Sequence, residues 1–201
     1  CTIGGVVANN ASGMCCGTEE NSYRTLRSLR FVLPSGTVVD SSAPDAEARF
    51  AHDEPEIAEG LLELRRKILA DPQVAGRIRD KVRLKNTTGY SVQAFLDAET
   101  PVEILRRLMV GSEGTLGFIA EAVFHTIPDD KHTLTSLMIF PDMHAACSAV
   151  APFVAAGAAA VELLDRASIA AVRGRPGVPE RWAQLPDTAT GLLVEFRDET
   201  P

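Results

Sequence analysis

The stretch TIGGVVANNASGMCCG, residues 2–17, is rich in Gly, Ala, Ser, Cys and Asn and contains no charged side chain. Small residues are used where a backbone turns sharply or where another group must approach it closely. Main-chain amides in such turns can bind an anion without Lys or Arg, and the first basic residue of the chain is Arg24. We therefore expect a side-chain-poor bend here, packed against either protein or a ligand.

A second glycine-rich stretch, GSEGTLG, occupies residues 111–117. It follows a predicted helix that begins at the capping box Thr100-Pro101-Val102-Glu103, and it precedes a strand predicted over 118–127. The Rossmann fingerprint needs the order strand, glycines, helix, and the P-loop needs Gly-x-x-x-x-Gly-Lys-Ser/Thr; neither pattern occurs. Because glycine-rich turns also serve purely structural purposes, the spacing alone leaves both interpretations open.

The segment between the two bends predicts a β-hairpin and a helical insertion. A strand around 29–33 leads into Pro34-Ser35-Gly36, which fits a type I turn, and a returning strand follows. Behind Pro55, helical spacing predicts an amphipathic helix with the apolar stripe Ile57, Leu61, Leu64 and Ile68. Asp71-Pro72 then predicts a second helix. Its basic face, Arg77, Arg79, Lys81 and Arg83, is either solvated or guides an anionic substrate or a partner domain.

The last third of the chain changes character. Strands are predicted over 134–140, 161–164 and 191–197, and Asp142 and Asp165 each fit the N-cap of an intervening helix. This β-α-β-α-β order is typical of half or more of a ferredoxin-like, split βαβ unit. We place the boundary between the two parts near 128–133, and we expect Trp182 and Phe196 in the second core.

Composition excludes several classes of function. The formal net charge of −7 and the pI of about 5.1 argue against nucleic acid and anionic membrane surfaces. No apolar run approaches the roughly 20 residues that a bilayer-spanning helix needs. The four cysteines lack CxxC spacing, so we expect small buried thiols in a reducing cytosol, with metal or redox use as the alternative. The histidines lack partners at metal-ligand spacing. Since the chain starts inside a motif without Met, we expect a piece of a longer protein.

Four motifs in order give a more specific indication: TIGGVVANNASGMCCG, NSYRTLRSLRFVLPSGTVVD, KNTTGYS and MVGSEGTLGFIAEAVF. Together they resemble the FAD-linked oxidases of the vanillyl-alcohol oxidase (PCMH) type. Within that family the resemblance is greatest to D-lactate dehydrogenase, glycolate oxidase large-subunit and D-2-hydroxyglutarate dehydrogenase relatives, including forms fused to an iron–sulfur domain. The resemblance covers roughly residues 2–127.

The resemblance implies an α+β fold in two parts. Residues 1–130 would form the second FAD-binding subdomain of the PCMH type, an antiparallel sheet with flanking helices and a helical insertion over 55–84. Residues 131–201 would begin the C-terminal, ferredoxin-like substrate domain. FAD is the implied cofactor; an iron–sulfur cluster is implied only for a full-length protein, and no metal site is implied in this chain.

The resemblance also implies a set of FAD-binding residues. Near the pyrophosphate and ribityl chain would lie the main chain of Thr2, Ile3, Gly4 and Gly5. Along the flavin ring or the phosphates would lie Ala8, Asn9, Ala11, Ser12 and Gly13. The adenosine half and ribityl region would be held by Glu113, Gly114, Gly117 and Ile119. Glu113 would be repelled by phosphate and should instead meet a ribose hydroxyl, a ring N–H or structural amides. No catalytic residue is assigned.

The implied activity is that of an FAD-dependent D-2-hydroxy-acid dehydrogenase, with D-lactate, D-2-hydroxyglutarate or glycolate as substrate. Hydride would pass from C2 of the hydroxy acid to flavin N5 while a base takes the hydroxyl proton. We expect this piece to be inactive in isolation, because the family's first phosphate loop and its substrate-side histidines are absent from it.

Two alternatives remain open at this stage. One is a non-catalytic scaffold or interaction domain, and the other is a different oxidase of the same superfamily. Implied partners are the remaining domains of the full-length protein or an electron acceptor. Self-association through exposed apolar surface is also expected, and nucleic acid is not. The implied location is cytoplasmic, or peripheral to the inner membrane through the electron acceptor.

Overall fold

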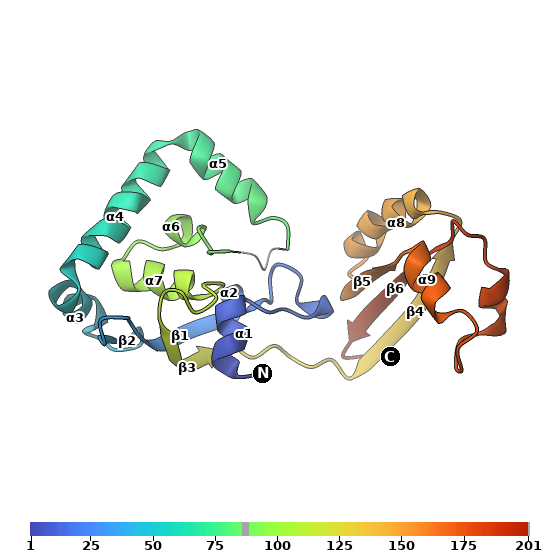
Figure 1. Cartoon of the computed structure of the whole chain (residues 1–201), viewed down its shortest axis with the longest axis horizontal. Helices are drawn as coiled ribbons and strands as arrows, with labels where there is room; N and C mark the ends of the chain where they lie inside the picture. Colours follow the sequence, from blue (N-terminus) through green and yellow to red (C-terminus); the bar gives the residue numbers. More distant parts are fainter. Residues whose placement is uncertain (86–88, 201) are drawn as a thin grey trace. The chain divides into compact units, whose positions relative to one another are not determined.

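A computed structural model describes residues 1–85 and 89–200 and divides the chain into two units, Cys1–Ile127 and Pro128–Pro201 (Figure 1). Within the described residues, each unit has a three-stranded antiparallel sheet and its own apolar core. The mixture of helices and antiparallel sheet confirms the expected α+β class.

The sheet of the first unit has the order β2-β1-β3, with β1 at Leu26–Val32, β2 at Val38–Asp40 and β3 at Phe118–Phe124. The predicted hairpin is confirmed: the Gly36 N–H donates to the Leu33 carbonyl at 2.8 Å, and Val32 pairs with Val38. Since β3 pairs only with β1 in the described structure, one side of its backbone is an open sheet edge.

In the described part of the first unit, the helices between β2 and β3 are α3 (Ala46–Asp53), α4 (Pro55–Ala70), α5 (Pro72–Lys81), α6 (Ala94–Asp97) and α7 (Pro101–Met109). Figure 1 shows α4 and α5 as an arch above α6 and α7. The Asp71 carboxylate accepts hydrogen bonds from Gln73 N and Val74 N, so the predicted cap of α5 is confirmed. This arch is the helical insertion, and it places the basic face of α5 above the loop that begins at Gly89.

Two details of these helices differ from expectation. The apolar stripe of α4 was wrong in part, because Ile57 and Leu64 are exposed while Ala58 and Leu61 are buried; spacing fixes the period of a stripe but not which side meets the core. The capping box was also wrong. In the described structure the Thr100 side chain makes no capping bond. The Glu103 carboxylate instead accepts from Arg106 at 2.7 Å.

The opening stretch is helical where a bend was expected. Residues Ile3–Asn9 form α1, and a short 3-10 turn (Met14–Cys16) and α2 (Ser22–Thr25) follow. The Thr2 side chain caps α1 by accepting from Gly5 N at 3.1 Å, which offsets part of the low helix propensity of Gly4-Gly5. Asn10 ends α1 in the left-handed conformation (φ 53°). The small residues therefore let a helix pack closely instead of letting a loop turn.

The second unit has the order β4-β6-β5, with both outer strands antiparallel to β6. The outer strands β4 (His132–Phe140) and β5 (Ala160–Leu164) thus run parallel on either side of β6 (Thr190–Asp198), which is a split βαβ arrangement. Between the strands lie α8 (Met143–Ala155), α9 (Arg166–Val172) and a 3-10 turn (Glu180–Gln184). The ferredoxin-like expectation is confirmed.

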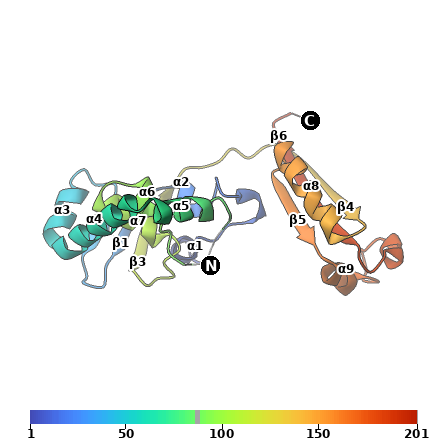
Figure 2. The same ribbon diagram turned by 90° about the horizontal axis from the view of Figure 1, so that it is seen from above.

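The helices of the second unit begin as the sequence predicts. Asp142 caps α8 by accepting from Ala145 N, and Asp165 caps α9 by accepting from Ser168 N. Figure 2 shows α8 lying along the sheet, where it covers the buried side chains Leu192 and Val194. Trp182 is buried in a separate small cluster with Ile169. The expectation of buried cysteines was wrong, because Cys1 and Cys147 are exposed and Cys15 and Cys16 are only partly buried. Among the described residues, no helix combines the length and apolar character that crossing a bilayer requires.

Candidate functional site

The two small-residue stretches converge in the first unit. The Gly111 N–H donates to the Val7 carbonyl at 3.2 Å, and the Glu113 N–H donates to the Ala8 carbonyl at 2.9 Å. A side-chain bond joins the same segments, because Asn9 Nδ2 donates to Glu113 Oε1 at 2.8 Å. The last part of α1 is therefore bonded along the 111–117 loop, although 104 residues separate Asn9 from Glu113.

Several glycines in these stretches are required by close contacts within the protein itself. A Cβ at Gly117 would lie 2.6 Å from the Val32 carbonyl oxygen, and one at Gly4 would lie 3.2 Å from the Ile119 oxygen. Gly111 has φ +84°, and a Cβ there would lie 2.9 Å from the Gly89 oxygen. At Gly117 and Gly111 the approach leaves no room for a Cβ, whereas at Gly4 a Cβ would require Ile119 to shift by a few tenths of an ångström. Gly4 thus lets α1 pack on β3, Gly117 lets the loop pack on β1, and Gly111 lets the loop pack on the segment that begins at Gly89.

Gly114 differs from these three. Its φ is +75°, but an added Cβ would meet no atom within 4 Å. It follows Glu113, which also lies in the left-handed region with φ 53°. Of these two left-handed residues, Gly114 faces open space, whereas the Glu113 N–H is bonded to the Ala8 carbonyl. Main-chain amides in such a turn can line a concave surface for a ligand.

A groove of about 740 Å³ opens between α1, the 111–117 loop and β3. We call it the groove throughout, and define it by Thr2, Ile3, Gly4, Gly5, Ala8, Glu113, Gly114, Gly117, Phe118, Ile119 and Ala120. The structure thus brings together nine of the thirteen residues that the sequence selects. Among the residues that line it, Glu113 is the only ionisable one, so main chain and small or apolar side chains form most of its surface.

Four of the selected residues lie elsewhere. Asn9, Ala11, Ser12 and Gly13 follow the helix away from the groove and are not among its lining residues. Asn9 bonds to Glu113, and the Gly13 carbonyl accepts from Lys85 Nζ at 2.8 Å. Asn9 thus connects α1 to the 111–117 loop, and Gly13 connects the chain after α1 to Lys85. Neither residue lines the groove.

Sequence reasoning missed two residues of the groove, Phe118 and Ala120. Phe118, the first residue of β3, is 71% exposed. The sequence could have indicated Phe118, because it directly follows Gly117 and a neighbour of a groove-lining residue is itself a candidate for the lining. An exposed ring beside a main-chain-lined groove is suited to stacking on a flat heterocycle.

A buried polar network supports α1 from below. Tyr23 is buried, its N–H donates to Asn10 Oδ1 at 3.3 Å, and its hydroxyl donates to Asp97 Oδ2 at 3.0 Å. Burial, and next the charge of Asp97, raise the pKa of the Tyr23 hydroxyl well above its usual value. The Arg107 guanidinium lies over the ring at 5.5 Å. Neutral Tyr23 therefore ties the end of α1 to α6.

The KNTTGYS loop is only partly within the described structure, since residues 86–88 lie outside it. Of its described residues, the Tyr90 hydroxyl is 2.7 Å from Thr115 Oγ1, and Ser91 Oγ donates to the Val110 carbonyl at 2.8 Å. This segment is therefore bonded to both ends of the glycine-rich loop. Within the ranges that the structure describes, no group of three or more His, Cys, Asp or Glu residues is placed to hold a metal ion.

Family models match both ends of the chain. One described as "FAD binding domain" matches residues 1–42, and one described as "FAD linked oxidases, C-terminal domain" matches residues 129–201. D-2-hydroxyglutarate dehydrogenase from Haemophilus influenzae is 27% identical over 168 residues, which are 82% of this chain and 16% of that protein. Glycolate oxidase subunit GlcD from Bacillus subtilis is 36% identical over 98 residues, which are 47% of this chain and 19% of that protein.

The chain thus spans less than a fifth of the length of these two curated relatives. Among solved structures, alkyldihydroxyacetonephosphate synthase in two crystal forms is similar, with TM-scores of 0.57 and 0.56 and 15% identity. The match covers 98% of this chain and 29% or 28% of the synthase. At this level of identity, the likeness concerns the fold.

Proposed function

This chain belongs to the FAD-linked oxidase family, and its cofactor is FAD; from this premise we propose that it forms part of the flavin site of a 2-hydroxy-acid dehydrogenase. The substrate class is supported by the names of two relatives, a D-2-hydroxyglutarate dehydrogenase and a glycolate oxidase subunit. Both names specify 2-hydroxy acids, so we infer an enzyme that acts on CH–OH groups.

The groove suits FAD on three grounds. It is lined mainly by glycines and apolar residues, Gly114 leaves room where a Cβ would otherwise project, and Phe118 offers an exposed aromatic face. We assign the main chain of Thr2, Ile3, Gly4 and Gly5 to the phosphate and ribityl region. We assign Glu113, Gly114, Gly117 and Ile119 to the adenosine half.

Glu113 belongs to the holding of the cofactor rather than to acid–base catalysis. Its carboxylate accepts a hydrogen bond from Asn9, which orients it along α1. It is the only ionisable residue in the lining of the groove, and its negative charge disfavours a phosphate at that position. We therefore place a ribose hydroxyl or ring N–H of FAD near Glu113 and the phosphates nearer Gly4 and Gly5.

The chemistry that FAD supplies is hydride acceptance at N5, here from C2 of the hydroxy acid. This chain contributes the surface that holds and orients the cofactor and the lining that excludes water from it. No general base is present among the residues of the groove other than Glu113, whose carboxylate is already hydrogen-bonded. We infer that the 201-residue chain binds FAD weakly and turns over no substrate.

The observation that carries the proposal is the convergence of α1 with the 111–117 loop around a main-chain-lined groove. The test compares two tryptophan substitutions on β3. Ala120 is exposed and lines the groove, and Val123 is 42% exposed and does not line it. We expect Ala120→Trp to raise the Kd for FAD at least tenfold, and Val123→Trp to change it less than twofold. Quenching of flavin fluorescence measures both values.

Activity is tested separately. The chain is mixed with FAD, a dye acceptor and D-2-hydroxyglutarate, D-lactate or glycolate, and we expect no dye reduction. Robust dye reduction would contradict the claim that acid–base groups are missing. Equal effects of the two tryptophan substitutions, or no FAD binding at all, would instead contradict the assignment of the groove and favour a non-catalytic scaffold.

A further inference from the structure

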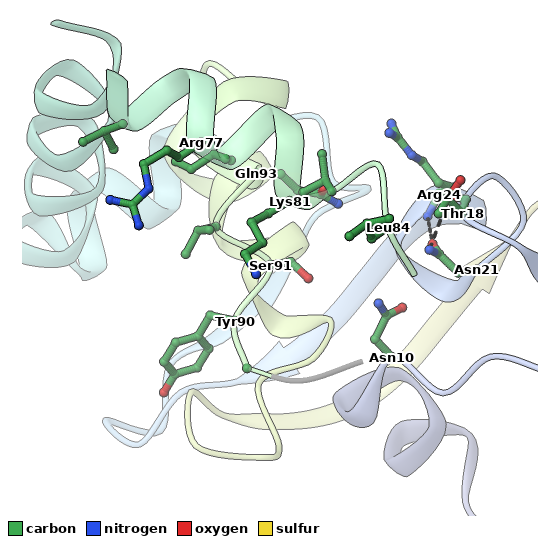
Figure 3. Close-up of a pocket in the computed structure, with 15 residues that line it drawn as sticks. Asn10, Thr18, Asn21, Arg24, Arg77, Lys81, Leu84, Tyr90, Ser91 and Gln93 are labelled. Atoms are coloured by element: carbon green, nitrogen blue, oxygen red, sulfur yellow. Dashed lines mark hydrogen bonds between the residues drawn. The ribbon is translucent and has the colours of Figure 1, made fainter. Parts of the chain in front are cut away.

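A second hollow lies beneath α5, next to the residue that ends α1. Its volume is about 320 Å³, and Figure 3 shows the residues that line it. Three of them are cations, namely Arg24 after the start of α2 and Arg77 and Lys81 on α5. We call this hollow the cationic pocket. Asn10, the residue that ends α1, also lines it, so the pocket and the groove share one helix.

The charge of the cationic pocket is one-sided. Among the described residues that line it, none is Asp or Glu, although the whole chain has 27 acidic and 20 basic residues. Within the described part of the chain, neither Arg24, Arg77 nor Lys81 forms an ion pair with a carboxylate. Arg77 and Lys81 lie four positions apart on one helix, where like charges repel. An anion in the pocket relieves this repulsion.

The remaining wall indicates what kind of anion fits. Val74, Ile78, Val82 and Leu84 line the pocket beside the cations, and Val74 and Leu84 are exposed apolar side chains. Figure 3 shows Lys81 extending from α5 toward Ser91, with Leu84 and Asn10 both to the right of this pair in the view. Inorganic phosphate would leave the apolar wall in contact with water. A carboxylate joined to a short aliphatic chain satisfies both parts of the lining.

We propose that the cationic pocket is a binding site for small aliphatic carboxylates, with Arg77 and Lys81 meeting the carboxylate groups and the apolar wall meeting the hydrocarbon chain. The site is distinct from the groove, and it does not depend on whether the groove holds FAD. Because all three cations are solvent-exposed, each contributes modestly, and affinity falls as salt is added.

The test uses glutarate, pentanoate and 1-pentanol as probes of the 201-residue chain labelled with ¹⁵N. We expect glutarate to bind more tightly than pentanoate, and the neutral 1-pentanol to bind at least fivefold more weakly than pentanoate. Amide shift changes are expected at Lys81, Ser91 and Gln93, and not at Gly114 or Ile119. No binding of glutarate at 20 mM, or shift changes centred on the groove, would overturn the proposal.

A matched pair of double variants isolates the charge of the pocket. Arg77→Gln with Lys81→Gln removes two cations that line it, and Arg79→Gln with Arg83→Gln removes two cations of the same segment that do not. We expect at least a fivefold loss of glutarate affinity in the first variant and less than a twofold loss in the second. Equal losses would mean that glutarate senses only overall charge and would overturn the site. Circular dichroism confirms that both variants are folded.

Discussion

The groove and the cationic pocket both adjoin α1, but they present different kinds of chemical group to a ligand. Close packing of backbones makes the groove, where Gly4 approaches Ile119 and Gly117 approaches Val32, and its only ionisable lining residue is an acid. Long side chains from α5 make the pocket, and its described charged residues are all basic. A main-chain site depends on exact packing of the fold, whereas a side-chain site depends on charges that can be removed without unfolding it.

The largest expected effect is the loss of stability when Gly117 is replaced, because the groove depends on backbone packing at this residue. A valine there would place its Cβ 2.6 Å from the Val32 carbonyl oxygen, so β1 and β3 must separate. Overpacking of this kind typically costs about 3 kcal/mol of the free energy of unfolding. Urea unfolding of Gly117→Val followed by circular dichroism measures the loss in the first unit. Trp182 is the chain's only tryptophan and lies in the second unit, so its fluorescence should not change.

Gly13→Val is the matched control for this experiment. Gly13 lies in the same small-residue stretch with φ −72°, and a Cβ there would meet nothing within 4 Å. We expect its free energy of unfolding to change by no more than about 0.5 kcal/mol. If both valines destabilise the first unit equally, the groove does not depend on backbone packing as the contrast requires.

High pH tests the support that α1 receives from Tyr23. Because burial raises the pKa of this hydroxyl in the folded chain, the folded state keeps its proton where the unfolded state loses it. The stabilisation is complete below the unfolded pKa of about 10 and is lost as pH rises above it. Each further pH unit then costs up to about 1.4 kcal/mol.

Urea midpoints between pH 8 and pH 11 measure this loss of stability. Tyr23→Phe should flatten the decline above pH 10, and Tyr90→Phe, at a tyrosine that is about half exposed, is the matched control variant. These are the chain's two tyrosines, so the pair separates the contributions fully. A decline that persists in Tyr23→Phe would show that another group is responsible.

The salt dependence of binding distinguishes the two sites, because only the cationic pocket attracts anions through charged side chains. The cations of the pocket are exposed, so their attraction for glutarate is screened as the Debye length shrinks. Between 50 and 500 mM NaCl we expect glutarate affinity to fall at least fivefold and FAD affinity to fall less than twofold. Titrations of both ligands on the same preparation measure this. Similar salt dependence would mean that FAD also relies on Lys and Arg side chains.

Local signals made much of the fold predictable. The turn at Pro34-Ser35-Gly36 specified the hairpin, and Asp71, Asp142 and Asp165 each began a helix where a capping side chain was expected. These signals act over a few residues and need no knowledge of the tertiary structure. The helical character of residues 3–9 was missed for the opposite reason, since contact with Ile119 and the Thr2 cap outweigh the low propensity of Gly4-Gly5.

The candidate sites were predictable to different degrees. Most residues of the groove belong to two recognisable motifs. Phe118 and Ala120 line it because β3 is an edge strand, and the position of a strand in its sheet depends on tertiary structure. The basic face of α5 was visible in the sequence. The sequence did not indicate which cations share the cationic pocket. Arg24 lines it together with Arg77 and Lys81, whereas Arg79 and Arg83 do not line it. This selection follows from how the α4–α5 arch lies over the loop after Gly89. Periodicity describes one helix face, not what lies opposite it.

The smallest expected effect concerns the one charge in the groove. Glu113→Gln removes a carboxylate but keeps an amide oxygen to accept from Asn9 Nδ2, so the loop should keep its conformation. Because a nearby negative charge disfavours a phosphate, FAD affinity should rise about twofold at low salt, and Glu20→Gln, outside the groove, should have no effect. Flavin fluorescence titration measures both. A loss of affinity in Glu113→Gln would mean that the carboxylate accepts a hydrogen bond from FAD strongly enough to outweigh repulsion, and the phosphates would then have to lie farther from the 111–117 loop.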